Sequence, residues 1–107
     1  KVERILVRDG AKVVVIPVAD LDYVEAQDDY VGLHVRGKVH LKQQTLADLE
    51  STLDESRFVR IHRSYLLNLE RLARLETEGA DARAAVLADG TRLPVSKSGY
   101  ARLKTLL

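Results

Sequence analysis

The sequence predicts a mainly β protein, built as an elongated arrangement of antiparallel β-sheets with one or two short helices. Many short stretches of the 107-residue chain alternate apolar and polar residues, which is the period-2 pattern of half-buried strands. Brief turns join these stretches, and no connection is long enough for the crossovers that parallel strands need. The pattern indicates about eight to ten strands in a meander, with the helices as accessories.

The chain is expected to open with a hairpin. Residues Arg4 to Val7 and Lys12 to Pro17 read as two strands joined through Asp9-Gly10, a dipeptide suited to the left-handed backbone of a tight turn. The stretches Leu21 to Ala26 and Tyr30 to Arg36 are the next two strands.

The register of the following hairpin is predicted from burial. Four apolar residues should share one buried face, namely Leu33, Val35, Val39 and Leu41, because a slip of one residue turns every side chain over. This register requires a three-residue loop from Arg36 to Lys38 and places His34 opposite His40. A two-histidine metal site is conceivable there, but no third ligand is evident. We favour two surface imidazoles.

Two short helices are expected. Thr45 to Leu53 carries Leu46, Leu49 and Leu53 at helical spacing, and Thr45 is placed to cap its N-terminus. Ser96 is a similar cap for a last helix, with Tyr100, Leu103 and Leu107 on one stripe. Gly99 lies inside that helix and lowers its intrinsic stability.

The second half of the chain adds further strands. Leu72 to Glu76 and Ala82 to Ala88 alternate weakly, and Asp89-Gly90 supplies a hairpin turn into Thr91 to Val95. The strand that begins at Phe58 is more distinctive, because it combines a β pattern with a block of positive charge.

In that strand, Val59 and Ile61 alternate with Arg60 and His62, so the apolar pair faces a core and the cationic pair faces solvent or a ligand. Arg63 breaks the alternation. The strand is therefore expected to end in a turn at Arg63 and Ser64, with a guanidinium and a hydroxyl at the tip.

Composition limits the class of protein. One domain, residues 1–107, is expected, because a chain of this length buries about two thirds of the surface that it exposes when unfolded. The chain has no cysteine, which excludes thiol catalysis and disulfides and is compatible with a cytoplasmic location. No apolar run reaches the length of a membrane span. Because it begins at Lys1 and contains no methionine, we expect it to be the C-terminal part of a longer protein.

Charge is polarised although the net charge is only +1. Acidic blocks occupy residues 20–29 and 46–56, and neither block contains a lysine or arginine. The central segment has five arginines against the single acid Glu70, at positions Arg57, Arg60, Arg63, Arg71 and Arg74. One explanation of these blocks is that the solvated faces of the protein happen to carry charges of opposite sign. The other is that the basic block forms a surface that binds a polyanion.

An enzyme is disfavoured. His62 and Ser64 lie two residues apart on one strand, and no third group orients the histidine as a base. No glycine-rich phosphate loop, zinc motif or dinucleotide fingerprint is present, so no catalytic residue, cofactor or metal is expected. Polyanion binding is the better class. The chain has only four tyrosines and one phenylalanine, too few exposed rings for base stacking, which favours duplex DNA over single strands.

Three segments carry a resemblance to a known family. They are YVEAQDDYVGLHV (residues 23–35), RFVRIHRSYLLN (residues 57–68) and LPVSKSGYARLK (residues 93–104). In order and spacing they resemble the signature blocks of the LytTR family, the DNA-binding domain of bacterial LytR/AlgR-type response regulators in two-component systems. The resemblance implies sequence-specific duplex binding for transcription regulation, with loops rather than a recognition helix entering successive major grooves. It also implies a receiver domain upstream. Because modules of this size usually bind tandem half-sites when they dimerise, we expect a dimer on such a site.

The same resemblance implies roles for individual residues. Arg63 matches a base-reading position, and Arg60 and Ser64 match phosphate-contacting ones, with His62 between them as a contact or as the group that shapes the turn. The remaining residues expected to touch DNA are Gln27, Asp29, Lys42, Thr45, Lys97 and Ser98.

This chain departs from the family pattern at two of its blocks. Members often carry a second basic residue where Ser98 stands, and Gly-Asn where Asp28-Asp29 stands. Two carboxylates at a groove-facing loop either repel phosphates or accept a hydrogen bond from a cytosine amino group, and the sequence leaves both open. The alternative function is a β-rich module of the same fold that binds a protein partner without DNA recognition.

Overall fold

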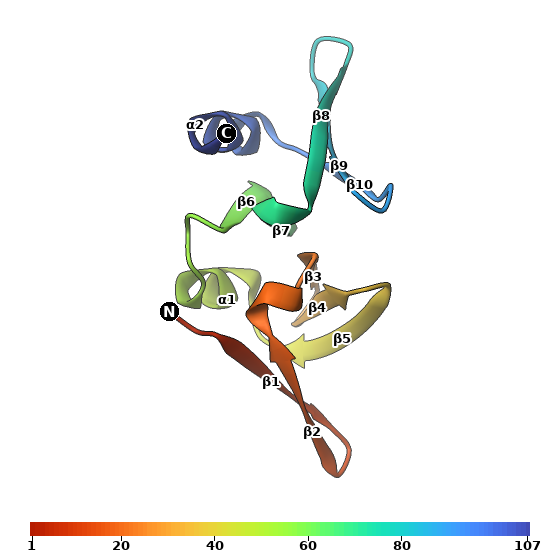
Figure 1. Cartoon of the computed structure of the whole chain (residues 1–107), viewed down its shortest axis with the longest axis vertical. Helices are drawn as coiled ribbons and strands as arrows, with labels where there is room; N and C mark the ends of the chain where they lie inside the picture. The colour runs from red at the N-terminus through yellow and green to blue at the C-terminus, as the bar shows by residue number, and fades with distance from the viewer.

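The computed structural model describes all residues, Lys1–Leu107, and confirms an elongated β-rich fold with extents of 48 × 25 × 24 Å (Figure 1). Ten strands form three antiparallel sheets. The strands are β1 (Arg4–Asp9), β2 (Lys12–Pro17), β3 (Tyr23–Gln27), β4 (Tyr30–Val35), β5 (Lys38–Gln43), β6 (Phe58–His62), β7 (Tyr65–Asn68), β8 (Leu72–Glu78), β9 (Ala82–Leu87) and β10 (Arg92–Pro94). The helices are α1 (Leu46–Thr52), α2 (Lys97–Leu106) and two 3-10 turns, η1 (Val18–Asp20) and η2 (Leu69–Arg71).

The central sheet has the order β5-β4-β3-β7-β6 and separates two hydrophobic cores. On one face β1, β2 and α1 cover a cluster that includes Leu33 and Leu66. On the other face β8, β9, β10 and α2 cover a cluster that includes Leu67 and Leu103. Leu66 and Leu67 point into different cores because successive residues of a strand face opposite sides. Figure 1 shows the layers stacked along the long axis.

Both predicted helix caps are confirmed. The hydroxyl of Thr45 accepts a hydrogen bond from the Asp48 amide at 3.1 Å, at the start of α1. The hydroxyl of Ser96 accepts one from the Gly99 amide at 3.0 Å, at the start of α2. Each cap satisfies an amide that would otherwise have no partner in the first helical turn.

The predicted register of the β4–β5 hairpin is wrong by one residue. Val35 pairs with Lys38, so the turn contains only Arg36 and Gly37, both in the left-handed region with φ of 48° and 82°. Two residues with positive φ give the turn whose twist matches the flanking strands, and this preference outweighs the burial of two more apolar side chains. Val39 and Leu41 are consequently exposed.

This register also separates the two histidines. His34 pairs with Val39, whereas His40 pairs with Leu33, so the two imidazoles lie on opposite faces of the sheet. The predicted pairing of His34 with His40 is therefore not formed. In the first hairpin the turn is likewise displaced, since Asp9 pairs with Lys12 and the turn residues are Gly10 and Ala11.

Replacing Arg36 with asparagine is expected to raise the free energy of unfolding by up to about 1 kcal/mol, because asparagine adopts left-handed backbone more readily than arginine. The ion pair of Arg36 with Asp20 is exposed, so its loss costs little. Urea denaturation measures the change. Gly37→Ala is the matched control and should destabilise the same turn, since its φ is also positive. Equal effects of the two substitutions would contradict this explanation.

Candidate nucleic-acid interface

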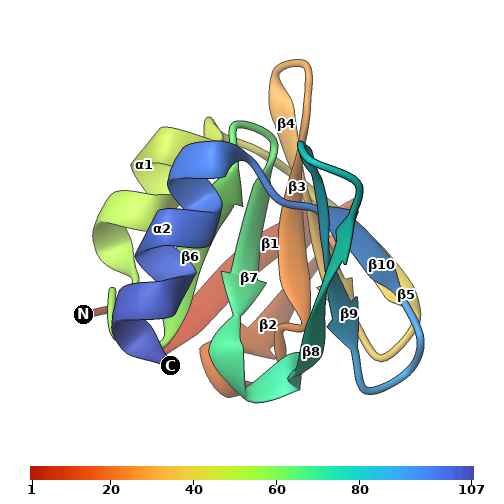
Figure 2. The same ribbon diagram turned by 90° about the horizontal axis from the view of Figure 1, so that it is seen from above.

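Several turns meet on one side of the molecule. In Figure 2 the β3–β4 turn, the β6–β7 turn and the segment that leads into α2 all lie along the upper edge. The pairing of β3 with β7 produces this arrangement, because it sets residues 23–25 beside residues 65–67. The fold therefore brings together the three segments that carry the resemblance.

The β6–β7 turn forms as predicted, with Arg63 and Ser64 between the two strands. His62 pairs with Tyr65, and a register shift lies between Arg60 and His62. The Nδ1 atom of His62 accepts a hydrogen bond from the Ser64 amide at 3.1 Å. His62 is thus a group that shapes the turn. The side chain of Arg63 has no hydrogen-bond or ion-pair partner, so its guanidinium is free to meet a ligand.

Arg60 is held by three internal contacts. Its guanidinium donates to the carbonyl oxygens of His62 at 3.0 Å and of Arg63 at 2.6 Å, and pairs with the carboxylate of Glu50 at 2.7 Å. The resemblance implies a phosphate contact at Arg60, and within the domain its guanidinium clamps the β6–β7 turn to α1. Glu50 lies in the acidic block of residues 46–56, and nothing local in the sequence marks it as a partner of Arg60.

α2 is docked on two backbone carbonyl groups of β6. The Ser96 amide donates to the Ile61 carbonyl at 2.8 Å, and the Arg102 guanidinium donates to the Arg60 carbonyl at 2.9 Å. A side-chain carbon at Gly99 would overlap the carbonyl group of Ile61. Gly99 therefore permits a close approach between helix and strand, a role that the predicted loss of helix stability did not reveal.

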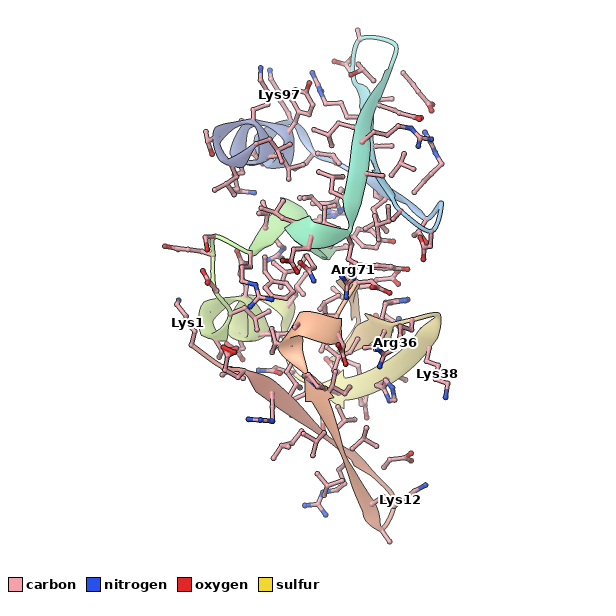
Figure 3. All side chains as sticks on the ribbon, in the orientation of Figure 1. Lys1, Lys12, Arg36, Lys38, Arg71 and Lys97 are labelled. Atoms are coloured by element: carbon pink, nitrogen blue, oxygen red, sulfur yellow. The ribbon has the colours of Figure 1, made fainter.

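These residues enclose a polar groove of about 450 Å³ with no hydrophobic residue in its lining. The lining residues are Glu50, Arg60, His62, Arg63, Ser96, Ser98 and Arg102. Three guanidinium groups face one carboxylate, so the groove keeps a positive charge. The hydroxyl of Ser98 lies 3.3 Å from that of Ser96. Lys97 does not line the groove but extends away from the body of the protein at the start of α2 (Figure 3).

The other predicted contact residues are more scattered. Gln27 and Asp29 lie at the exposed β3–β4 turn, where Asp28 has a φ of 55°. The Gln27 amide lies over Gly32 on the next strand, in space that a side chain at Gly32 would fill. Thr45 is occupied as the cap of α1. The ammonium of Lys42 donates to the Leu6 carbonyl on β1 at 2.9 Å, which ties it to the first hairpin.

A cluster of polar and aromatic groups supports the β6–β7 turn from behind. Tyr65 donates a hydrogen bond to Glu25 at 3.1 Å, and the His34 ring stacks on Tyr23 with centroids 4.0 Å apart. The Nε2 atom of His34 lies 3.3 Å from Glu25, but the geometry does not suit a hydrogen bond. Burial lowers the pKa of His34 against the opposing effect of Glu25. Burial, with the Glu25 hydrogen bond, raises the pKa of Tyr65.

Comparison with known proteins defines the class. The sequence model of the LytTr DNA-binding domain matches residues 11–107. The chain is therefore a DNA-binding domain of the kind found in transcription regulators. This chain is a member of the LytTR family. Neither helix is long and apolar enough to cross a membrane.

Relatives are found among bacterial regulators. The chain is 28% identical over 98 residues to the sensory transduction protein LytT of Bacillus subtilis, covering 92% of the chain and 41% of LytT. It is 37% identical over 100 residues to an uncharacterized response regulatory protein of Shewanella oneidensis, covering 91% and 39%. It is 31% identical over 97 residues to the heme-containing CO-sensing transcriptional regulator RcoM 1 of Paraburkholderia xenovorans, covering 90% and 36%. The chain thus spans less than half the length of these relatives.

A solved structure confirms the fold. The LytTr DNA-binding domain of a putative methyl-accepting/DNA response regulator from Bacillus cereus superposes with a TM-score of 0.87 at 20% identity. The match covers 99% of this chain and 97% of that one.

Proposed function

We propose that this domain reads duplex DNA with Arg63 at the tip of the β6–β7 turn. A guanidinium that is free of internal partners can donate two hydrogen bonds to the O6 and N7 atoms of a guanine in the major groove. Ser64, Lys97, Ser98 and Arg102 flank it and meet phosphates. The observation that carries the proposal is the contrast between Arg63, which has no partner, and Arg60, which has three.

Arg60 takes a positioning role in this proposal. Its charge is balanced by Glu50, and its donors hold the backbone of the residue whose side chain reads the base. The β3–β4 turn, with Gln27 and Asp29, approaches a second point on the duplex, where a carboxylate can accept a hydrogen bond from a cytosine amino group. Because the relatives include response regulators, we place the domain beside a receiver domain in the cytoplasm, bound as a dimer to tandem half-sites.

The salt dependence of binding tests the electrostatic part of the proposal. If Lys97 and Arg102 each neutralise one phosphate charge while Arg63 contacts a base, log affinity should fall with log salt at a slope of about −2. The target is first found by selecting bound sequences from a random duplex pool at two salt concentrations. Fluorescence anisotropy of the selected duplex then gives the slope. If the affinity does not depend on salt and the anisotropy of the duplex does not rise even at low salt, the protein-binding alternative is favoured.

The contrast between Arg60 and Lys97 gives a second expected result. Lys97→Ala should reduce the magnitude of the slope, from about −2 to about −1, because an exposed ammonium is lost. Arg60→Ala should leave the slope unchanged while weakening binding, because its charge is already paired with Glu50. Glu50→Gln is the control, since it frees the Arg60 charge without shortening either side chain. If Arg60→Ala and Lys97→Ala reduce the magnitude of the slope equally, then Arg60 contacts a phosphate as Lys97 does.

A further inference from the structure

The outer edge of β2 carries unpaired backbone groups. β1 and β2 form a two-stranded sheet, and Asp9 pairs with Lys12 across its two-residue turn. The pair that flanks such a turn is the hydrogen-bonded kind. Hydrogen-bonded pairs alternate along an antiparallel ladder, so the amide and carbonyl groups of Val13 and Val15 point away from β1. Leu6 pairs with Val15, and its carbonyl also points out of the ladder, where it accepts a hydrogen bond from the Lys42 ammonium.

The side chains along this edge are apolar and exposed. Val13 and Val15 are 55% and 51% exposed, and Leu6 beside them on β1 is 55% exposed. No other strand of the protein pairs with β2. An apolar edge with a free row of donors and acceptors is a template for another strand, and natural proteins usually protect such edges. Here Lys12 and Pro17 stand at the two ends of the strand, and the four residues between them carry no charge.

A groove of about 300 Å³ runs beside this edge and is lined on its far side by the β4–β5 hairpin. The residues that face β2 across the groove include Arg36, Lys38 and His40. Asp20 is the only acid in the lining, and its contact with Arg36 is long, at 3.4 Å, with the Arg36 side chain 74% exposed. Figure 3 shows Lys12, Arg36 and Lys38 on the same side of the molecule. The groove is therefore cationic on one wall and offers a free strand edge on the other.

We propose that β2 accepts an extended acidic peptide segment of a partner protein as an added strand. The peptide backbone pairs with the free groups of Val13 and Val15. The side chains of the added strand alternate between its two faces. Those on one face are acidic and contact the cations of the β4–β5 hairpin. Those on the other face are apolar and extend the exposed apolar surface of Val13 and Val15.

Charge argues against a second copy of this chain as the added strand. The only charged residue of β2 is Lys12, so pairing of β2 with another β2 brings a cation toward Arg36 and Lys38. An acidic segment has the complementary charge. The groove also lies at the opposite end of β4 from the β3–β4 turn. This surface does not overlap the proposed DNA contacts, so the peptide and the DNA can bind at the same time.

The test uses a short synthetic peptide in which glutamate alternates with valine, titrated into the isotope-labelled domain and followed by NMR. The amides of Val13 and Val15 should shift and become protected from hydrogen exchange, whereas the Val14 amide, already in the ladder with Val7, should change little. The same peptide with lysine in place of glutamate should bind at least about tenfold more weakly. Equal binding of the two peptides, or no change at Val13 and Val15, would overturn the proposal.

Two variants separate the backbone and charge contributions. Val15→Pro removes one outward amide at an edge position that tolerates proline and should weaken peptide binding at least about tenfold, while Val15→Thr, which keeps the amide, stays within about threefold. Lys38→Glu should also weaken binding and leaves the β2 backbone intact. Unchanged affinity in Val15→Pro and Lys38→Glu would contradict the proposal, as would a concentration-dependent dimer that Val15→Pro abolishes. DNA affinity should remain at the wild-type value in all three variants, which keeps this test independent of the DNA proposal.

Discussion

Replacing Gly99 with alanine is expected to destabilise the domain by about 3 kcal/mol or more. Intrinsic helix propensity alone predicts the opposite sign, a gain of about 1 kcal/mol, because alanine is the better helix former. The new methyl group would overlap the Ile61 carbonyl, and the backbone on both sides is fixed. α2 must therefore move away from β6, which breaks the contact between the Ser96 amide and Ile61.

The sign of the change in urea denaturation decides between these two effects. Ala101→Gly is the matched control, since Ala101 is exposed on the same helix and should lose only the propensity difference of about 1 kcal/mol. The displaced helix should also weaken DNA binding, because Lys97 and Ser98 move with it. A stabilised Gly99→Ala variant would show that the close approach of α2 to β6 is wrong.

Replacing Arg63 with alanine is expected to cost about 1–3 kcal/mol of DNA-binding free energy and to relax base preference at one position of the site. Folding stability should change little, because the Arg63 side chain makes no hydrogen bond or ion pair within the domain. Anisotropy titrations of the selected duplex and of duplexes changed at one base pair measure both effects.

Arg8→Ala provides the control for general loss of positive charge. Arg8 is exposed on β1, away from the polar groove, and should bind DNA like the wild type. If Arg63→Ala weakens binding equally on every duplex, then Arg63 contacts a phosphate rather than a base. If it has no effect on any duplex, the β6–β7 turn does not face the DNA.

Local patterns in the sequence predict much of the fold. The alternation in Val59 to His62 and the caps at Thr45 and Ser96 depend on neighbouring residues alone, and the structure confirms all three. The β4–β5 register was predicted wrongly because burial and turn geometry favoured different answers. The exposed Val39 and Leu41 show that turn geometry prevailed.

The parts of the candidate site that could not be predicted depend on residues far apart in the chain. Arg60 and Glu50 are ten residues apart, on different elements, and their ion pair changes Arg60 from a free cation into a clamp. Gly99 lies thirty-eight positions from Ile61 in the numbering, and only their packing explains a glycine in a helix. The resemblance pointed to the β6–β7 turn, but it did not reveal the contacts that Arg60 and His62 make within the domain.

The strand order of the central sheet has a consequence for biosynthesis. β7 is inserted between β3 and β6, so a nascent chain that has left the ribosome only as far as β5 holds β3 without its second neighbour. Until residues 65–68 emerge, that unsatisfied flank is free to capture other incomplete chains. Premature termination before Tyr65 should therefore yield insoluble fragments instead of a smaller folded unit. The domain can fold only after β7 has been synthesised.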